Sequence, residues 1–307
     1  MRDYDVIVVG GGPAGFTAAL YTSRGRLDTL LVERAFSGGQ MAVTNEMENY
    51  PGFEEPISGT ELAHRMEKQA KRFGTAVVTG DVTGLELEED MKTVKTTAGI
   101  FRAKAVILCM GASPKKLEIP GEKKFTGSGL SYCATCDGAF FKGMKVAVIG
   151  GGDTAAEDVL FLTRFCEKVY LIHRRDRLRA TKVLQEAVFI NKKIEVIWDT
   201  TVEEITGDFG VTAIRLKNLK SGGGFDLAVE GVFVAIGNIP NTKLVTGKIN
   251  TCDYGYIITD ENMQTNIPGV YAAGDIREKP LRQVITAASD GAVAAYTAER
   301  YISEKVW

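Results

Sequence analysis

Short apolar runs of strand length recur along this chain, and two stretches repeat the same order of elements. In each stretch an apolar run enters a glycine-rich turn, a helix-like segment follows, and a second apolar run closes the unit. The first stretch has these segments at residues 5–9, 14–24 and 28–32. The second has them at residues 145–149, 154–165 and 168–172. The pattern therefore predicts two βαβ units.

The two units begin 140 residues apart (150 − 10 = 140), which is too far for a single mononucleotide-binding unit. Two similar segments, 105–114 and 231–241, each contain an apolar strand followed by glycine and proline. Such interruptions are expected where a chain crosses between domains. Another strand is predicted at residues 270–273, after the second crossing. We therefore expect the second domain to be inserted into the first.

The turn of the first unit, Gly10-Gly11-Gly12-Pro13-Ala14-Gly15, fits the dinucleotide-binding pattern G-x-G-x-x-G. In this pattern Gly10 allows a tight turn, Gly12 lets the backbone approach a pyrophosphate, and Gly15 lets helix and strand pack closely. The following helix offers amide donors and its positive dipole to the phosphates. The unit ends at Glu33, 18 residues after Gly15 (33 − 15 = 18), where a carboxylate can accept hydrogen bonds from ribose hydroxyls.

The turn of the second unit, Gly150-Gly151-Gly152-Asp153-Thr154-Ala155, is a variant with alanine at the last position. At the same distance (173 − 155 = 18) this unit ends at His173, followed by Arg174 and Arg175, with Arg179 further on. A carboxylate would repel a 2′-phosphate there, whereas guanidinium groups bind it through paired hydrogen bonds. The alternative is that the arginines form only a solvated charged surface. We interpret His173 as a neutral contact residue.

The opposite endings of the two units assign FAD to the first and NADP(H) to the second. The predicted fold class is α/β, with two Rossmann-like dinucleotide-binding domains, the second inserted into the first. Residues 1–112 and 244–307 are expected to form the FAD-binding domain, and residues 113–243 the NADP(H)-binding domain.

Length and composition fit two ordinary domains, since the chain has 307 residues, of which 45% are hydrophobic and 25% charged. A net charge of −2 gives no reason to expect nucleic acid or an anionic membrane as partner. The apolar runs are too short to span a bilayer. Residues 1–5 pass directly into a strand, and the five cysteines are an odd number. We therefore expect a cytoplasmic protein with neither a secretion signal nor a disulfide scaffold.

A closely spaced cysteine pair, Cys133-Ala134-Thr135-Cys136, lies just before the second fingerprint, with Asp137 behind it. A structural zinc site needs four ligands, but the other cysteines, Cys109, Cys166 and Cys252, are isolated and the chain has only two histidines. A C-x-x-C pair at the start of a short helix is suited to redox chemistry, because the helix dipole and amide donors stabilise a thiolate. Asp137 could serve as acid or base for a departing thiol, or could simply be a helix-start acid.

These motifs together resemble the low-molecular-weight, bacterial-type thioredoxin reductases over essentially the whole chain. Other matching stretches are 38–40, 48–52, 269–275 and 282–283. The resemblance implies a homodimer that passes electrons from NADPH through FAD and the cysteine pair to thioredoxin or a thioredoxin-like protein. It also implies that Cys136 faces the flavin and that Cys133 attacks the partner disulfide. The chain departs from the family at Met110, usually threonine, and at Ala139, usually an aromatic residue that helps to dock thioredoxin.

The resemblance also supplies residues for the cofactor sites. The flavin contacts that it implies are Gly12, Ala14, Glu33, Gln40, Asn49, Asp275, Arg282 and Gln283. The complete set of predicted cofactor contacts is Gly10, Gly12, Pro13, Ala14, Gly15, Glu33, Gly39, Gln40, Asn49, Gly111, Gly150, Gly152, Asp153, Thr154, His173, Arg174, Arg175, Arg179, Ile236, Gly237, Gly274, Asp275, Arg282, Gln283 and Val284. The predicted catalytic residues are Cys133, Cys136 and Asp137, and no metal site is predicted.

The cysteine pair precedes the second fingerprint by only 14 residues (150 − 136 = 14), so disulfide and nicotinamide belong to one domain and the flavin to the other. Both must come close to the flavin, and we therefore expect the domains to rotate during turnover. Two alternatives remain open. One is a flavoprotein that reduces ferredoxin or oxygen, in which the cysteines are incidental. The other is a non-catalytic protein that senses nucleotides and changes shape with redox state.

Overall fold

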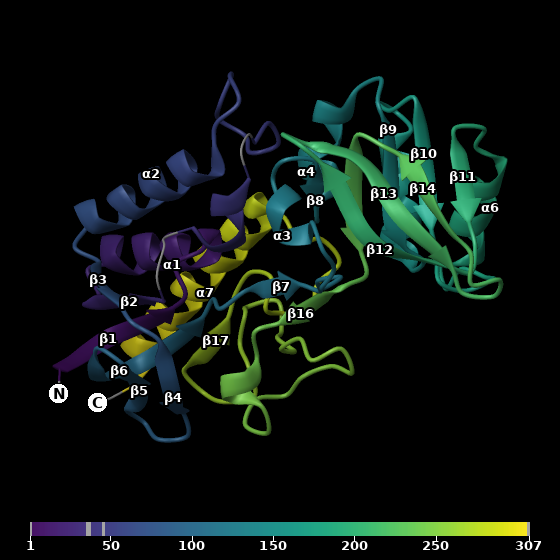
Figure 1. Cartoon of the computed structure of the whole chain (residues 1–307). Helices are drawn as coiled ribbons and strands as arrows, with labels where there is room; N and C mark the ends of the chain where they lie inside the picture. The colour runs from purple at the N-terminus through teal and green to yellow at the C-terminus, as the bar shows by residue number, and fades with distance from the viewer. Residues whose placement is uncertain (1, 35–37, 45–46, 306–307) are drawn as a thin grey trace. The chain divides into compact units, whose positions relative to one another are not determined.

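The computed structural model describes residues 2–34, 38–44 and 47–305, and over that part the chain forms two compact units (Figure 1). The first unit comprises Met1–Ser113 and Ile239–Trp307, and the second comprises Pro114–Asn238. The second unit is thus an insertion in the sequence of the first. Each unit is an α/β layer structure of the Rossmann-like kind that the repeated βαβ pattern predicts.

The sheet of the first unit has the strand order β3-β2-β1-β6-β5-β4, with β17 beside β6. Strands β1, β2, β3, β6 and β17 pair in parallel, whereas β4 and β5 continue the sheet in antiparallel fashion. At the carboxyl ends of the parallel strands, Val9 pairs with both Val32 and Leu108. The strands are β1 (Arg2–Val9), β2 (Thr29–Glu33), β3 (Ala76–Thr79), β4 (Val82–Glu86), β5 (Lys92–Thr96), β6 (Gly99–Leu108) and β17 (Val270–Ala272).

Helices α1 (Pro13–Arg24), α2 (Gly59–Arg72) and α7 (Val284–Glu304) cover one face of this sheet (Figure 1). Successive side chains of a strand point to opposite faces. Val6 and Val8 of β1 therefore pack against the helices, and Ile7 packs in the core of the other face. Small residues let α7 approach α1 closely, since a Cβ on Gly291 would lie 2.2 Å from the carbonyl oxygen of Ala14.

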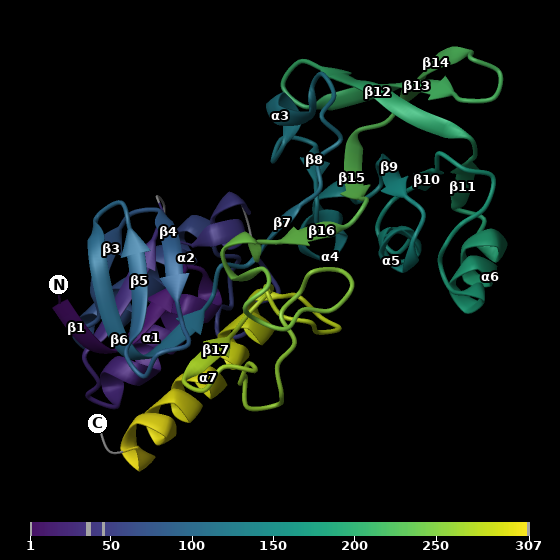
Figure 2. The same cartoon turned by 90° about the horizontal axis from the view of Figure 1, so that it is seen from below.

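The second unit has a fully parallel sheet in the order β11-β10-β9-β15-β8. Helices α5 and α6 lie on one side of it, and an antiparallel sheet of β12, β13 and β14 lies on the other (Figure 2). The strands are β8 (Leu130–Ser131), β9 (Lys145–Gly150), β10 (Lys168–Ile172), β11 (Ile194–Ile197), β12 (Thr200–Gly207), β13 (Val211–Asn218), β14 (Gly224–Ala228) and β15 (Gly231–Ala235). The helices are α3 (Glu122–Phe125), α4 (Ala134–Asp137), α5 (Asp153–Leu162) and α6 (Lys182–Ile190).

The alternation along β9 divides the core of the second unit. Val146 and Val148 pack under α5 and α6, whereas Ala147 and Ile149 pack against the antiparallel sheet. A strand that is buried on both faces must be apolar at every position, which explains the uninterrupted apolar run that the sequence shows there.

Short elements complete the fold: β7 (Ala112–Pro114), β16 (Asn238–Pro240) and the 3₁₀ turns η1 (Gly39–Val43), η2 (Gly138–Phe141) and η3 (Lys243–Val245). Strands β7 and β16 pair with each other where the chain passes between the units. No helix in the described part of the chain is long and apolar enough to cross a membrane.

Several element ends differ by one to three residues from the sequence prediction; β1, for example, begins at Arg2 instead of residue 5. Helix α5 ends at Leu162 instead of residue 165, because the chain turns there and the Lys193 ammonium binds the carbonyl oxygens of Thr163 and Cys166. Strand β15 ends at Ala235, one residue before the predicted end, and Gly237 then takes a φ of 104° in the region that favours glycine.

Candidate functional site

The first fingerprint forms the turn between β1 and α1. Gly10 has a φ of 107°, and a Cβ there would lie 2.4 Å from the carbonyl oxygen of Cys109. A Cβ on Gly15 would lie 1.8 Å from the carbonyl oxygen of Gly10. A Cβ on Gly12 would meet nothing within 4 Å. The turn and the helix packing thus require Gly10 and Gly15, whereas Gly12 leaves open space of the kind that a pyrophosphate needs.

Glu33 at the end of β2 reaches back to this turn. Its carboxylate accepts a hydrogen bond from the backbone N–H of Gly11 and a second, of 2.8 Å, from the N–H of Arg34. Gly11 lies so close that a Cβ on it would come within 2.9 Å of Glu33 Oε2. Helix α1 begins beside this carboxylate with no side chain capping its first turn, so its amide groups are available to an anion.

The second fingerprint repeats the arrangement between β9 and α5. A Cβ on Gly150 would lie 2.5 Å from the carbonyl oxygen of Ala235, and one on Gly151 would lie 2.2 Å from the His173 ring. A Cβ on Gly152 would meet nothing within 4 Å. Helix α5 begins at Asp153 without a side-chain cap. The protein itself therefore offers the same open, amide-rich turn twice.

His173 is buried, with 5% of its surface exposed. It closes the second βαβ unit, just as Glu33 closes the first. Burial is the largest cause that lowers its pKa, and the charges of Arg179 and Arg175 act in the same direction. The ring is therefore held neutral. Its Nε2 atom is buried and has no hydrogen-bond partner.

Four exposed arginines follow His173 in the loop after β10: Arg174, Arg175, Arg177 and Arg179. Arg177 lies in the same charged run but is not among the residues predicted from the sequence. Of the ion pairs that the structure records in the described ranges, none involves these four side chains. The loop is anchored by its backbone, because the N–H of Arg179 donates to the carbonyl oxygen of Gly151 at 2.7 Å.

Three buried side-chain atoms in the described part of the chain have no hydrogen-bond partner: His173 Nε2, Asp275 Oδ1 and Arg282 Nε. All three belong to residues that the sequence analysis predicted to contact cofactors. An unsatisfied buried polar group is costly and uncommon in a folded protein. The residues present therefore fit dinucleotide cofactors, which would supply the missing partners.

Asp275 lies just after β17, beside the buried charges of α7 and its preceding loop. Burial raises the pKa of its carboxyl, and the charges of Lys279 and Arg282 oppose that effect. Arg282 lies with its guanidinium carbon 3.9 Å from the centre of the Tyr256 ring. One end of the first unit's sheet thus gathers the carboxyl of Asp275, the guanidinium of Arg282 and the ammonium of Lys279.

Asp290 on α7 ties this group together, and the sequence analysis missed it. Its carboxylate accepts hydrogen bonds from the Gly274 N–H at 3.0 Å, from Arg277 at 3.0 Å and from Lys279 at 2.8 Å. All three charged side chains are largely buried, with exposures of 6% to 14%. Asp290 thus holds the backbone immediately before Asp275. The sequence signal is an acid within the stretch of mostly small residues Ala287–Ala295.

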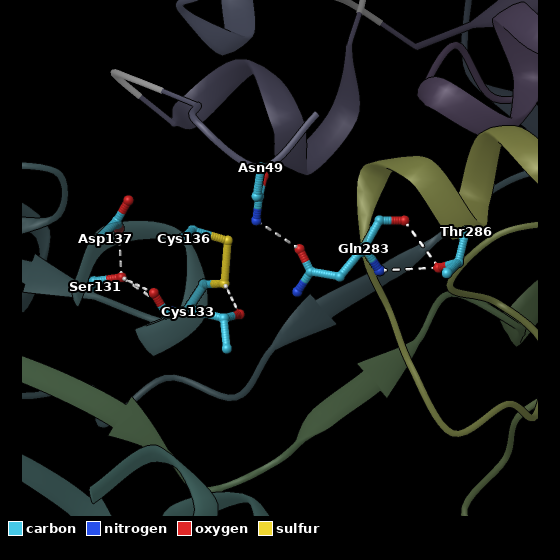
Figure 3. The surroundings of a disulfide bond; sticks show 8 residues. Asn49, Ser131, Cys133, Cys136, Asp137, Gln283 and Thr286 are labelled. Atoms are coloured by element: carbon cyan, nitrogen blue, oxygen red, sulfur yellow. Dashed lines mark hydrogen bonds between the residues drawn. A yellow bond between two sulfur atoms is a disulfide. The ribbon is translucent and has the colours of Figure 1, made fainter. Parts of the chain in front are cut away.

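The 3₁₀ turn η1 lies beside the first fingerprint. A Cβ on Gly39 would lie 3.6 Å from the Cα of Gly12, which places Gln40 next to that turn. Asn49 donates a 3.2 Å hydrogen bond to Oε1 of Gln283, and Figure 3 shows the two side chains pointing at each other. Gln283 in turn caps α7 through a reciprocal pair of hydrogen bonds with Thr286. Val284 packs against the apolar cluster beneath this segment.

Cys133 and Cys136 form a disulfide at the start of α4, with Cys133 as the N-cap residue (Figure 3). Asp137 ends the same short helix, and its Oδ2 atom is 2.5 Å from the hydroxyl of Ser131. Burial raises the pKa of Asp137, and the hydrogen bond from Ser131 opposes that effect. The Sγ atom of Cys133 lies 3.4 Å from the hydroxyl of Thr135.

The other cysteines have a different environment. Cys109 and Cys166 are buried, and burial raises the pKa of both thiols, that of Cys166 to about 11. Such thiols are poor nucleophiles. Among the described residues no cluster of His, Cys, Asp or Glu side chains is arranged to hold a metal ion.

The remaining predicted contacts lie near the chain crossings. Gly111 follows β6 with a φ of 64°, and its carbonyl oxygen accepts the N–H of Asn241. Ile236 and Gly237 follow β15, and the carbonyl oxygen of Gly237 accepts the N–H of Lys115. The structure thus gathers the first fingerprint with Gln40, Asn49, Asp275, Arg282 and Gln283 in one unit, and the second fingerprint with the arginines and the cysteine pair in the other.

The chain is similar in sequence and structure to known disulfide oxidoreductases. A family model described as pyridine nucleotide-disulphide oxidoreductase matches residues 4–291. The thioredoxin reductase of Listeria monocytogenes is 48% identical over 302 residues, which are 98% of this chain and 94% of that protein. The solved thioredoxin reductase of Streptococcus pyogenes is 44% identical, covers 99% of both chains and gives a TM-score of 0.93. The thioredoxin reductase of Lactococcus lactis, solved in an FR conformation, is 46% identical, covers 98% of this chain and 100% of its own, and gives a TM-score of 0.70.

Proposed function

Because this chain belongs to the pyridine nucleotide-disulphide oxidoreductases and, within them, to the low-molecular-weight thioredoxin reductases, we propose that it carries electrons from NADPH through FAD to Cys133 and Cys136. The dithiol then reduces the disulfide of thioredoxin or a thioredoxin-like protein. The observation that supports the cofactor choice best is that the three unpartnered buried atoms all lie on predicted cofactor residues. The two other readings of the sequence, a ferredoxin- or oxygen-reducing flavoprotein and a non-catalytic sensor, do not account for the disulfide at the start of α4.

For the flavin, we propose FAD at the first fingerprint. Glu33 would hold the adenosine ribose, the amides of α1 the pyrophosphate, and Asp275 the ribityl chain. Arg282 and Gln283, at the start of α7, would lie by the isoalloxazine ring. The chemistry that a bound flavin supplies is acceptance of a hydride from reduced nicotinamide and delivery of two electrons to a disulfide.

For the nicotinamide cofactor, we propose NADP(H) at the second fingerprint. The exposed guanidinium groups of Arg174, Arg175 and Arg179 suit a 2′-phosphate, because they donate paired, charged hydrogen bonds. The neutral ring of His173 would lie against the same ribose. The open turn at Gly152 and the uncapped start of α5 suit the pyrophosphate.

The dithiol step follows from ordinary thiol–disulfide exchange. The thiolate of Cys133 attacks one sulfur of the partner disulfide, a new S–S bond forms, and the other partner sulfur leaves and takes a proton. The thiol of Cys136 then gives up its proton as its sulfur attacks Sγ of Cys133, which restores the internal disulfide and releases the second partner sulfur, with that proton, as a thiol. We assign the proton for the leaving sulfur to Asp137, whose pKa is raised by burial.

Domain rotation between the two half-reactions is part of the proposal. The cysteine pair and the second fingerprint lie in one unit and the flavin residues in the other, so each must approach the flavin in turn. Two relatives of similar identity and nearly complete coverage give TM-scores of 0.93 and 0.70. That spread is expected if related chains are solved with different domain arrangements. Gly111 and Gly237, at the two crossings, have the backbone freedom that a hinge uses.

The partner and the assembly state complete the proposal. Phe140, which follows the cysteine motif, is 41% exposed and available to a docking protein. We propose that two copies of the chain form the active molecule, as the family resemblance implies. We also propose a cytoplasmic location, a reducing compartment in which a closely spaced cysteine pair serves catalysis and not structure.

The experiment that tests the function is NADPH oxidation with and without oxidised thioredoxin. We expect the purified protein to be yellow, to bleach with NADPH in the absence of oxygen, and to consume NADPH continuously only when thioredoxin is present. Thioredoxin-independent turnover that survives alkylation of the thiols would contradict the proposal.

A further inference from the structure

The hydroxyl of Ser131 lies between the carboxyl of Asp137 and the backbone of Cys133. Its Oγ atom is 2.5 Å from Asp137 Oδ2 and 3.0 Å from the backbone nitrogen of Cys133 (Figure 3). It is also 3.3 Å from the carbonyl oxygen of Cys133. Ser131 is 6% exposed, and β8, on which it lies, pairs with β15 at Phe233. The hydroxyl is therefore held in place by the sheet.

The chemistry of these groups determines which of them donates. A hydroxyl has one proton and two lone pairs. The N–H of Cys133 can only donate, so Ser131 accepts from it. While Asp137 is ionised, Ser131 donates its proton to Oδ2. When Asp137 is protonated, the acid can donate to Ser131, and the hydroxyl proton can turn to the carbonyl oxygen of Cys133.

We propose that Ser131 is a positioning residue that couples the protonation of Asp137 to the backbone of Cys133 at the start of α4. Its hydroxyl keeps the acid beside the dithiol and keeps the N-cap residue in the geometry from which Cys133 attacks. This inference rests on the proposed role of Asp137 as the proton donor. It adds a residue whose hydroxyl hydrogen-bonds to that acid and to the Cys133 backbone.

The step in which Ser131 acts is the first half of the exchange. The thiolate of Cys133 forms a bond to one sulfur of the partner disulfide while the partner S–S bond breaks, and the departing sulfur receives the proton of Asp137. Asp137 then becomes a carboxylate, and the Ser131 proton turns toward it. The second bond, formed by Cys136, regenerates the disulfide. The thiol proton of Cys136 passes to the second departing sulfur, so the partner receives two electrons and two protons, and Asp137 regains its proton from water before the next turnover.

The charged side chains nearest to α4 on a neighbouring element lie on helix α5. Helix α5 packs against α4 and carries Asp153, Glu157 and Asp158, while η2, the next element, has no charged residue. The pKa of Asp158 is raised to about 7, mainly by burial and also by Glu157. For Asp137 the causes are burial and the opposing hydrogen bond from Ser131. Removal of the hydroxyl should therefore raise the pKa of Asp137.

The test compares two acceptors with the fully reduced holoenzyme in single-turnover reactions. One acceptor is oxidised hydroxyethyl disulfide, whose alkyl thiolate needs a proton to leave. The other is Ellman's reagent, whose aromatic thiolate is a weak base and leaves without one. We expect Ser131→Ala to slow the alkyl reaction about tenfold and to leave the aromatic reaction unchanged. Its pH profile with the alkyl acceptor should shift upward by roughly one pH unit.

Three further variants separate the possible failures. Ser131→Thr retains a hydroxyl and should restore the alkyl rate, and Ser128→Ala, an exposed serine in the preceding turn, should change neither rate. Asp137→Asn should slow only the reaction with the alkyl disulfide. If it does not, Asp137 is not the proton donor. The proposed function is tested separately, by NADPH turnover with thioredoxin. If Asp137→Asn has that effect and Ser131→Ala does not, the role of Ser131 is overturned. Equal loss of both rates in Ser131→Ala also overturns it, since that result marks a merely structural residue.

Discussion

Gly151 lies directly against the ring of His173, so closely that a Cβ on the glycine would come within 2.2 Å of the imidazole. The first unit has the same relationship between Gly11 and Glu33, where the glycine N–H binds the carboxylate. In both units the second glycine of the Gly-Gly-Gly run packs against a side chain at the end of the second strand, either its last residue, Glu33, or the residue just after it, His173. The sequence pattern treats this middle position as variable. The structure shows that it lies in contact with the residue predicted to bind the ribose.

The first prediction concerns the glycines of the second fingerprint. Gly151→Ala must displace the buried His173 ring, and we expect it to lower stability by about 1–3 kcal/mol, because added volume strains a packed site. Gly152→Ala meets no protein atom within 4 Å, so the variant should fold normally and lose only NADPH affinity. Thermal unfolding and NADPH titration measure the two effects. Similar melting temperatures for the two variants would show that the His173 contact is unimportant.

The second prediction concerns cofactor choice. Each charged hydrogen bond to a 2′-phosphate contributes roughly 1.5–3 kcal/mol, which is about ten- to a hundredfold in affinity. Arg174→Ala with Arg175→Ala should therefore raise the KM for NADPH steeply and leave that for NADH nearly unchanged. Lys192→Ala removes an exposed charge elsewhere in the same unit and should affect neither. An equal loss with both cofactors would exclude the phosphate assignment.

The third prediction assigns the two sulfurs. Cys136→Ser leaves Cys133 free to attack thioredoxin but removes the thiol that resolves the mixed disulfide. We therefore expect a covalent complex with thioredoxin that is visible by non-reducing electrophoresis and is released by dithiothreitol. Cys133→Ser should form no such complex. Trapping that instead requires Cys136 would reverse the two roles.

The fourth prediction concerns Asp290. Asp290→Asn leaves two buried cations, Arg277 and Lys279, without their carboxylate, and breaking a buried ion pair costs about 3–5 kcal/mol. Because Asp290 also holds the Gly274 N–H, the variant should retain flavin poorly through dialysis. The matched control is Asp90→Asn, which breaks an exposed pair with Lys305 and should alter neither stability nor flavin content measurably. Full flavin retention in Asp290→Asn would limit Asp290 to a role in stability.

The fifth prediction tests domain rotation. A cross-link that fixes the two units in one orientation should separate the half-reactions in anaerobic stopped-flow measurements. Either flavin reduction by NADPH or reduction of the Cys133–Cys136 disulfide should survive, and the other should stop. The control is release of the cross-link, which should restore both half-reactions. The linker should be photocleavable, because a reductant would also reduce the Cys133–Cys136 disulfide. Both half-reactions at full rate in the locked protein would rule out the rotation mechanism.

The sequence alone determined the features that depend on neighbouring residues. The glycine spacings from Gly10 to Gly15 and from Gly150 to Ala155 predicted both strand–turn–helix units, since a tight turn and close helix packing are local requirements. The disulfide could be predicted for the same reason, because its cysteines are three residues apart. The charges at the ends of β2 and β10, an acid at Glu33 and a basic run after His173, can also be read directly from the sequence.

Only the tertiary structure decided which distant groups meet. Asn49 and Gln283 are 234 residues apart, and they touch because η1 and the start of α7 are brought to the same end of one sheet. Asp290 binds Gly274 and Lys279 because α7 turns back over the sheet after β17. Even Ser131 and Asp137, which are only six residues apart, meet because pairing of β8 with β15 sets the direction in which the Ser131 hydroxyl points. Such contacts depend on strand order and helix packing, and no residue pattern within a short window specifies them.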